Sequence, residues 1–283
     1  MGVGAVLGGE ALAMEPIARS HDTRLKVSCC AYSLRKYLQG EEKNMELTDF
    51  IARAVDWGLD GVELTSYYFA EKTAEYARAL RRQCFLSGID VSGTALGNKF
   101  AVPPGPEREK QIADVRQWID LAEAMGAPCM RVFGGPVPKD MPVDEAIGWA
   151  VDGLNEAAEY AATKGVYLAL ENHGGVTDTP ANMLRILKGV ESDWVGANLD
   201  TGNFHGEDVY GDVAELAPYA VNVHLKAHVK PAGKPAEPTD FSRVTEILRE
   251  AKYSGYISLE YEASEDPMTA VPRLIDQMRA AIA

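Results

Sequence analysis

Four apolar runs in the second half of the chain each end in a side chain that can bind a metal ion or move a proton. In chain order these side chains are Glu171, Asp200, His224 and Glu260. Three carboxylates and one imidazole form an oxygen-rich ligand set that suits manganese, magnesium, cobalt or zinc, and the sequence does not choose among these ions. Without an ion, several like charges would share one poorly solvated site. We therefore expect one divalent metal ion where the four runs end together.

The same residues suggest a reaction. A metal ion can polarise a carbonyl or alkoxide oxygen while a nearby carboxylate moves a proton on the adjacent carbon. In a closed barrel, Glu171 and Glu260 come from strands across the barrel and are suited to approach opposite faces of a bound carbon. One glutamate would remove the proton and the other would return it, which is what epimerisation or aldose–ketose isomerisation requires.

The run from Val166 to His173 illustrates how these side chains are positioned. It is apolar at first and ends in Glu171, Asn172 and His173. Because successive side chains of a strand point to opposite faces, Glu171 and His173 are expected on one face and Asn172 on the other.

An apolar strand followed by a longer amphipathic segment occurs eight times from Leu25 onward. The expected strands are 25–32, 61–64, 89–95, 129–133, 166–173, 195–200, 220–226 and 255–261, and the expected helices are 46–57, 71–86, 107–125, 143–164, 179–189, 209–216, 241–252 and 267–282. Eight even units predict a single (β/α)8 barrel over residues 25–283 rather than an open doubly wound sheet. The Rossmann glycine pattern is also missing after the first strand, where Ala31-Tyr32-Ser33-Leu34-Arg35 stands. A barrel gathers the carboxyl ends of all its strands around one mouth, which explains why the polar residues cluster at those ends.

Residues 1–24 differ from the rest of the chain. Val3 to Leu12 is small and apolar, and Ala11-Leu12-Ala13 is similar to an export cleavage site, but no Lys or Arg precedes it. Two interpretations stay open: a disordered or packing N-terminal arm of a cytoplasmic protein, or the remnant of a signal peptide of an exported one. No stretch approaches the ~20 apolar residues of a membrane span, so we expect no membrane partner.

Composition excludes one class of partner. The net charge of −14 and the isoelectric point near 4.8 oppose binding to nucleic acid, whose phosphates are normally met by clustered Lys and Arg. Small neutral or locally neutralised substrates fit better. The four cysteines show neither a disulfide framework nor zinc-type spacing, and we interpret them as buried thiols.

Four motifs carry a resemblance to a known family. The runs are Leu170-Glu171-Asn172-His173, Leu199-Asp200-Thr201-Gly202-Asn203, Val223-His224-Leu225-Lys226 and Ser258-Leu259-Glu260-Tyr261. They resemble those of the sugar phosphate isomerase/epimerase family, the xylose isomerase-like barrels, over nearly all of the chain from Leu25. The resemblance implies metal ligation by the Glu, Asp, His and Glu of these runs, proton transfer between the two glutamates, and a carbohydrate substrate.

Six further residues are candidates for substrate binding: His173, Lys226, Glu63, Arg131, Asn203 and His205. His173 matches a family residue that commonly faces the substrate. Lys226 shares the inward face with His224 and could bind a substrate oxygen or phosphate. Glu63 lies at the end of the second expected strand, and Arg131 lies in the fourth. For both residues, a salt bridge that closes the barrel is an alternative to contact with the substrate.

The chain also departs from the family pattern. Ala227 follows Lys226 where many members have Asp, and five histidines are too few for the three zinc ions of endonuclease IV relatives. The substrate is therefore expected to be a sugar, a keto-sugar or a cyclic polyol, and free sugars are slightly favoured because no phosphate-binding loop is evident. A dehydratase of a keto-inositol or keto-sugar at the same site, or a sugar-binding barrel without catalysis, are the alternatives. Whether the chain forms a homo-oligomer stays open.

Overall fold

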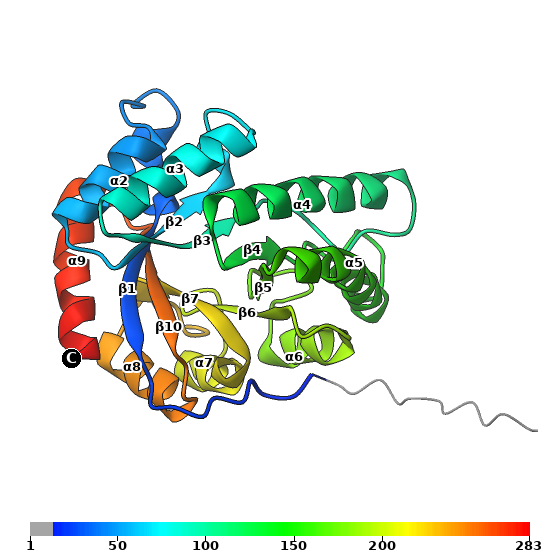
Figure 1. Cartoon of the computed structure of the whole chain (residues 1–283). Coiled ribbons are helices and arrows are strands. Elements are labelled where there is room, and N and C mark those ends of the chain that lie inside the picture. The colour runs from blue at the N-terminus through cyan, green and yellow to red at the C-terminus, as the bar shows by residue number, and fades with distance from the viewer. Residues whose placement is uncertain (1–13) are drawn as a thin grey trace, which may run out of the picture.

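Eight of the apolar runs form parallel strands that close a barrel (Figure 1). The barrel strands are β1 (Leu25–Cys30), β2 (Gly61–Thr65), β3 (Asp90–Ala95), β4 (Cys129–Phe133), β5 (Tyr167–Glu171), β6 (Val195–Asp200), β7 (Ala220–Lys226) and β10 (Gly255–Glu260). Each strand pairs with the next, and the pairing of Ser28 in β1 with Ser258 in β10 closes the ring. This computed structural model describes residues 14–283, and it confirms the predicted (β/α)8 barrel.

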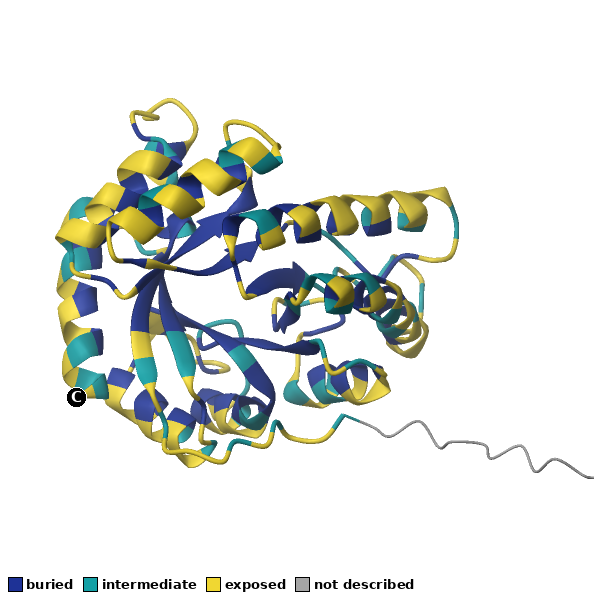
Figure 2. Ribbon diagram, in the orientation of Figure 1, coloured by how far each residue is buried: buried dark blue, intermediate teal, exposed yellow. Residues whose placement is uncertain are grey.

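Helices follow the strands and surround the barrel. They are α2 (Leu47–Asp56), α3 (Ala74–Leu86), α4 (Pro106–Met125), α5 (Val143–Lys164), α6 (Pro180–Gly189), α7 (Val209–Leu216), α8 (Phe241–Glu250) and α9 (Pro267–Ile282). Each buries one stripe: in α2, Leu47, Phe50, Ile51 and Ala54 recur at intervals of three and four residues and are buried. Figure 2 shows the result, with buried strands inside and exposed residues on the outer faces of the helices.

Glycines end two of the helices before a strand, and a side-chain cap begins a third. Gly126 and Gly165 end α4 and α5 with φ angles of 74° and 66°, which a residue without Cβ adopts freely. Thr179 caps α6, because its side chain accepts a hydrogen bond from the backbone N–H of Asn182. The sequence pattern did not predict the short helix α1 (Arg35–Leu38) or the hairpin formed by β8 (His228–Val229) and β9 (Glu237–Pro238).

The described part of the N-terminal segment packs beneath the barrel, at the amino ends of the strands. The backbone N–H of Ile17 donates to the carbonyl of Pro218 at 3.0 Å, and the Arg19 guanidinium donates to the carbonyl of Ala220 at 2.5 Å. Arg19 also lies over the ring of Tyr253. The sequence at 11–13 that is similar to a cleavage site lies outside the described residues. Within residues 14–283, no helix is both long and apolar enough to cross a membrane.

Polar side chains fill much of the barrel interior. Their contacts join strands that are not neighbours in the barrel, which shows that these side chains point inward. Ser28 of β1 and Ser92 of β3 share a hydrogen bond of 2.6 Å between their hydroxyl oxygens. Closer to the carboxyl ends of the strands, Glu63 of β2 contacts His224 of β7. The interior therefore becomes more highly charged toward the carboxyl end, where the candidate site lies.

Candidate active site and metal centre

The four metal-ligand types predicted from the sequence lie together inside the carboxyl end of the barrel. One ligand atom from each of Glu171, Asp200, His224 and Glu260 lies within 4.8 Å of the others. They come from β5, β6, β7 and β10, which are four consecutive strands of the barrel, and the register places Asp200 opposite His224. All four side chains are buried. Glu171 and Glu260 stand on the two outer strands of this set.

Two atoms in this cluster lack hydrogen-bond partners among the described residues. They are Asp200 Oδ2, which lies 3.3 Å from the Lys226 ammonium without a hydrogen bond to it, and His224 Nδ1; both are buried. His224 Nδ1 lies 3.4 Å from Glu171 Oε2 and 3.5 Å from Glu260 Oε2. A buried polar atom without a partner costs about 1–3 kcal/mol, so its presence calls for an explanation. Three carboxylates and an imidazole nitrogen form a donor set that fits a divalent cation, and such an ion would bind both of these atoms.

Glu171 is held by an ion pair and two amides. Its Oε2 lies 3.1 Å from Arg131 Nε and accepts a hydrogen bond of 2.9 Å from Asn198 Nδ2. Its Oε1 accepts a hydrogen bond of 3.2 Å from Asn203 Nδ2. Burial alone would raise the pKa of Glu171, but the Arg131 guanidinium and His224 lower it below its ordinary value. Glu171 is therefore a carboxylate at neutral pH.

Lys226 binds the carboxylates on the other side of the cluster. Its Nζ lies 2.5 Å from Glu260 Oε2, 2.5 Å from Glu262 Oε2 and 3.3 Å from Asp200 Oδ2. Burial opposes ionisation of Glu260, but His224 and Lys226 lower its pKa well below the ordinary value. For Asp200, burial raises the pKa to about 8 even though Lys226 acts in the opposite direction. Glu262 was not among the residues predicted from the sequence, although it follows Glu260 by two residues.

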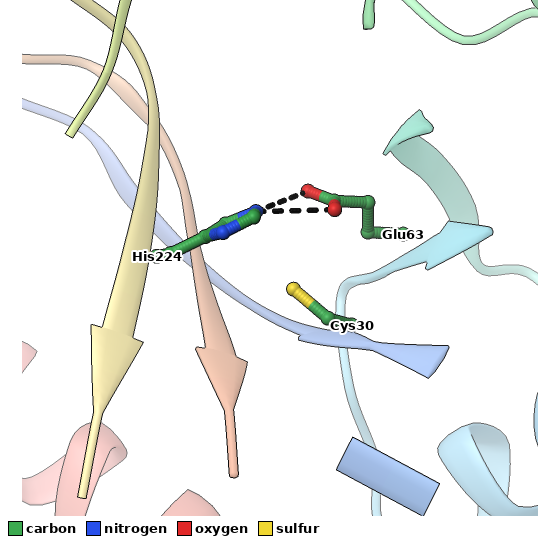
Figure 3. A group of neighbouring side chains, drawn as sticks. All are labelled: Cys30, Glu63 and His224. Carbon is green, nitrogen blue, oxygen red and sulfur yellow. Dashed lines mark hydrogen bonds and ion pairs between the residues drawn. The ribbon is translucent and has the colours of Figure 1, made fainter. Parts of the chain in front are cut away.

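Glu63 contacts His224 from the other side of the barrel interior, as Figure 3 shows. The His224 Nε2 atom lies 2.9 Å from Glu63 Oε2 and 3.1 Å from Oε1, and Asn222 Nδ2 donates to Oε2 at 2.9 Å. The Cys30 thiol lies beside them, and burial raises its pKa well above the ordinary value. Asn222 and Asn198 were not predicted to be functional. Each precedes an expected metal ligand by two residues, His224 and Asp200 respectively, and this spacing on one strand face could have identified them.

His173 and His205 lie farther out. Strand β5 ends at Glu171, earlier than predicted, and His173 is exposed with its ring 4.3 Å from that of Phe133. The strand ends there because the chain turns at Gly174 and Gly175, which both have positive φ angles. His205 is also exposed, and its Nδ1 lies 3.3 Å from the carbonyl oxygen of Lys230.

The Asn172 side chain links β5 to β6 at this point. Its Oδ1 accepts from the backbone N–H of Asp200 and its Nδ2 donates to the carbonyl of Asp200, each at 2.9 Å. The backbone around Asp200 is thereby fixed against the end of the neighbouring strand, next to Glu171.

A cavity of about 250 Å³ opens beside the cluster. Its lining includes Asn203, Lys226, Ala227, His228 and Glu262. Two members of this lining, Asn203 and Lys226, contact Glu171 and Glu260 directly. A small polar molecule in the cavity would therefore lie next to the carboxylate cluster.

Comparison with known proteins places the chain in a family. The model of the xylose isomerase-like TIM barrel matches residues 51–281. No curated protein matches the chain by sequence. Among solved structures, a D-psicose 3-epimerase with D-tagatose from Clostridium cellulolyticum H10 is 14% identical with a TM-score of 0.74, over 91% of this chain and 99% of that one.

Two further solved structures share the fold. A 3-keto-D-glucoside 4-epimerase from E. coli is 14% identical with a TM-score of 0.71, over 91% of this chain and 99% of that chain. A xylose isomerase domain protein from Planctomyces limnophilus is 17% identical with a TM-score of 0.70, over 93% of this chain and 99% of that chain. At these identities the likeness shows the shared fold, and the family model covers most of the sequence. The chain therefore belongs to the family of xylose isomerase-like TIM barrels.

Proposed function

We propose that the chain is a divalent-metal-dependent isomerase or epimerase that acts on a sugar, a keto-sugar or a cyclic polyol. The observation that carries this proposal is the buried set of Glu171, Asp200, His224 and Glu260, in which Asp200 Oδ2 and His224 Nδ1 face the cluster without hydrogen-bond partners among the described residues. These four residues would hold the ion. A divalent ion bound there would polarise neighbouring carbonyl and hydroxyl oxygens of a substrate. The similar folds of the two epimerases support the reaction class.

The two glutamates perform the proton transfer in this proposal. Glu171 and Glu260 project from the outer strands of the four, and a carbon bound between them could be approached from two sides. One glutamate, as a carboxylate, takes the proton from the carbon next to the carbonyl group. The other glutamate is also ionised at neutral pH in the metal-free protein, so it must first take up a proton from solvent, which it then gives to the opposite face. The two glutamates exchange protonation states in each turnover.

Five of the six remaining candidate residues divide into two groups, and Glu63, which contacts His224, belongs to neither. Lys226 and Arg131 each form an ion pair with one of the two glutamates, and we assign them to orienting these carboxylates. Asn203, His173 and His205 are then left to bind substrate hydroxyl groups. Of these three, Asn203 is the best supported as a substrate-binding residue, because it contacts Glu171 and also lines the cavity.

Metal analysis and isotope exchange test this function together. Protein purified without chelator should carry about one divalent ion per chain, and its products from ketoses or inososes in D₂O should carry solvent deuterium at the reacting carbon. The Glu171→Gln and Glu260→Gln variants should lose the exchange. A dehydratase would instead release water and form a conjugated product that absorbs in the ultraviolet. A protein that binds no divalent ion even when ions are added contradicts the proposal.

A further inference from the structure

Glu63 makes a contact that crosses the barrel. It comes from β2 and His224 from β7, strands that are separated by β1 and β10 in the barrel order. Both Glu63 oxygens lie within hydrogen-bond distance of His224 Nε2, at 2.9 and 3.1 Å, and both side chains are at most 1% exposed (Figure 3). The two residues are far apart in the sequence, and the contact gives each buried side chain a polar partner.

The contact decides which nitrogen of His224 is available to a metal ion. An ionised carboxylate only accepts hydrogen bonds, so Nε2 carries the hydrogen that points to Glu63. The other nitrogen, Nδ1, then faces the oxygens of Glu171 and Glu260 at 3.4 and 3.5 Å. A half-turn of the ring would put Cδ2 and Cε1 where Nδ1 and Nε2 now lie, so it would break the contact with Glu63 and remove a nitrogen from the cluster.

Glu63 also begins a chain of hydrogen bonds that reaches a second ligand. Asn222 Nδ2 lies 2.9 Å from Glu63 Oε2 and 2.7 Å from Asn198 Oδ1, and Asn198 Nδ2 donates to Glu171 Oε2 at 2.9 Å. The carboxylate of Glu63 is therefore connected to the imidazole of one expected ligand and, through two amides, to the carboxylate of another.

We propose that Glu63 is a positioning residue for the metal centre: it holds His224 with Nε2 protonated and Nδ1 directed at the ion, and it does so without touching the substrate. The proposal rests on the proposed function, because it assumes that the cluster binds a divalent ion. Partners of this kind typically change metal affinity by about 10–100-fold when they are removed.

Cys30 provides a matched control. Its thiol lies in the same group of three as Glu63 and His224, and it is equally buried. A thiol is a weak hydrogen-bond partner, so it cannot fix the ring as a carboxylate does. If the three side chains instead formed a second metal site, Cys30 would bind an ion as a thiolate, and the chain would carry two ions.

The test compares metal binding by the full chain and its Glu63→Gln and Cys30→Ala variants. We expect Glu63→Gln to weaken Mn²⁺ binding by about 10–100-fold in a competition titration. Cys30→Ala should change the Mn²⁺ affinity by less than about threefold. At saturating Mn²⁺, Glu63→Gln should regain most of its turnover, which a residue that acts directly in proton transfer would not. Equal Mn²⁺ affinity of the parent and Glu63→Gln overturns the inference, as does loss of a second bound ion in Cys30→Ala.

A measurement on the unmutated chain covers the case in which Glu63→Gln does not fold. In the Zn²⁺-loaded protein, a long-range ¹H–¹⁵N spectrum should show His224 protonated at Nε2 and metal-bound at Nδ1, with the signal assigned by its absence in His224→Gln. The opposite arrangement overturns the inference. If the parent chain binds neither Mn²⁺ nor Zn²⁺, the proposed function itself fails, and this outcome is distinct from equal binding by parent and variant.

Discussion

Pairs of lysine with carboxylate lie at both ends of the barrel, and their surroundings differ. At the amino end, Lys26 Nζ lies 3.1 Å from Asp90 Oδ2, and the two side chains are 52% and 60% exposed. At the carboxyl end, Lys226 Nζ lies 2.5 Å from Glu260 Oε2, with exposures of 9% and 6%. Water screens the first pair, so it contributes roughly 0–1 kcal/mol. The second pair cannot lose one partner without leaving an uncompensated buried charge. The same residue types thus join strands loosely at one end and maintain a concentrated set of charges at the other.

The largest difference between the two ends should appear in turnover. Glu260→Gln keeps the size of the side chain but removes a proton acceptor, and we expect turnover to fall by about 10²–10⁴-fold. Asp90→Asn makes the same chemical change at the amino end and should leave turnover within about twofold, because it lies outside the site proposed for proton transfer. Steady-state kinetics on an accepted ketose at saturating metal measures both variants. Comparable losses in the two would break the distinction.

The second largest difference should be in the free energy of unfolding, which we expect to depend much more on Lys226 than on Lys26. Lys226→Met leaves the buried carboxylates Asp200 and Glu260 without their cation, and we expect the metal-free protein to lose about 3 kcal/mol in free energy of unfolding. Urea unfolding with chelator present measures this change. The double variant Lys226→Met, Glu260→Gln should lose less than the sum of the single changes, because it removes both charges of one pair. Additive losses would show that the pair is not energetically coupled.

The pH dependence of stability should reveal Asp200. In the metal-free protein, burial raises the pKa of Asp200 to about 8, above its value of about 4 in the unfolded chain. Folding therefore favours the protonated form, and the contribution of Asp200 to stability falls as the pH rises from about 4 to about 8. Because asparagine does not titrate, Asp200→Asn should become more stable relative to the parent between pH 5 and pH 8, by about 4 kcal/mol. Urea unfolding at pH 5 and pH 8 measures this difference. If the free energy of unfolding changes by the same amount in the parent and in Asp200→Asn, the assignment is contradicted.

The smallest change is expected for the exposed pair. Lys26→Met should lower the free energy of unfolding by less than about 1 kcal/mol, and the loss should shrink further in 1 M salt, where the Debye length is about 3 Å. The same urea titration at low and high salt measures it. A loss as large as that of Lys226→Met would mean that exposure does not set the strength of these pairs.

The sequence was sufficient to predict the barrel and the members of the carboxylate cluster. Each of Glu171, Asp200, His224 and Glu260 ends an apolar run, and a parallel barrel brings such ends together without further information. The partner of Glu63 was not predictable in this way. Its contact with His224 joins strands that are not neighbours, so it depends on how the strands tilt across the interior and not on any spacing in the sequence.

Local irregularities were also missed, for physical reasons. The β8 and β9 strands are two residues each, too short for an alternating pattern, and they lie in a proline-rich loop. The early end of β5 reflects the turn at Gly174 and Gly175, whereas the polar run Glu171-Asn172-His173 gave no indication of where pairing stops. Glu262 lies beyond the end of β10, where strand alternation no longer predicts direction.

Asn172 makes the position of Asp200 independent of the loop that follows β5. Its amide takes over the pairing with Asp200 where the backbone of β5 has already left the sheet. The loop that follows, residues 173–179, is therefore not needed to keep Asp200 in place beside Glu171. Such a loop can change in length and sequence while the spacing of the carboxylates stays constant.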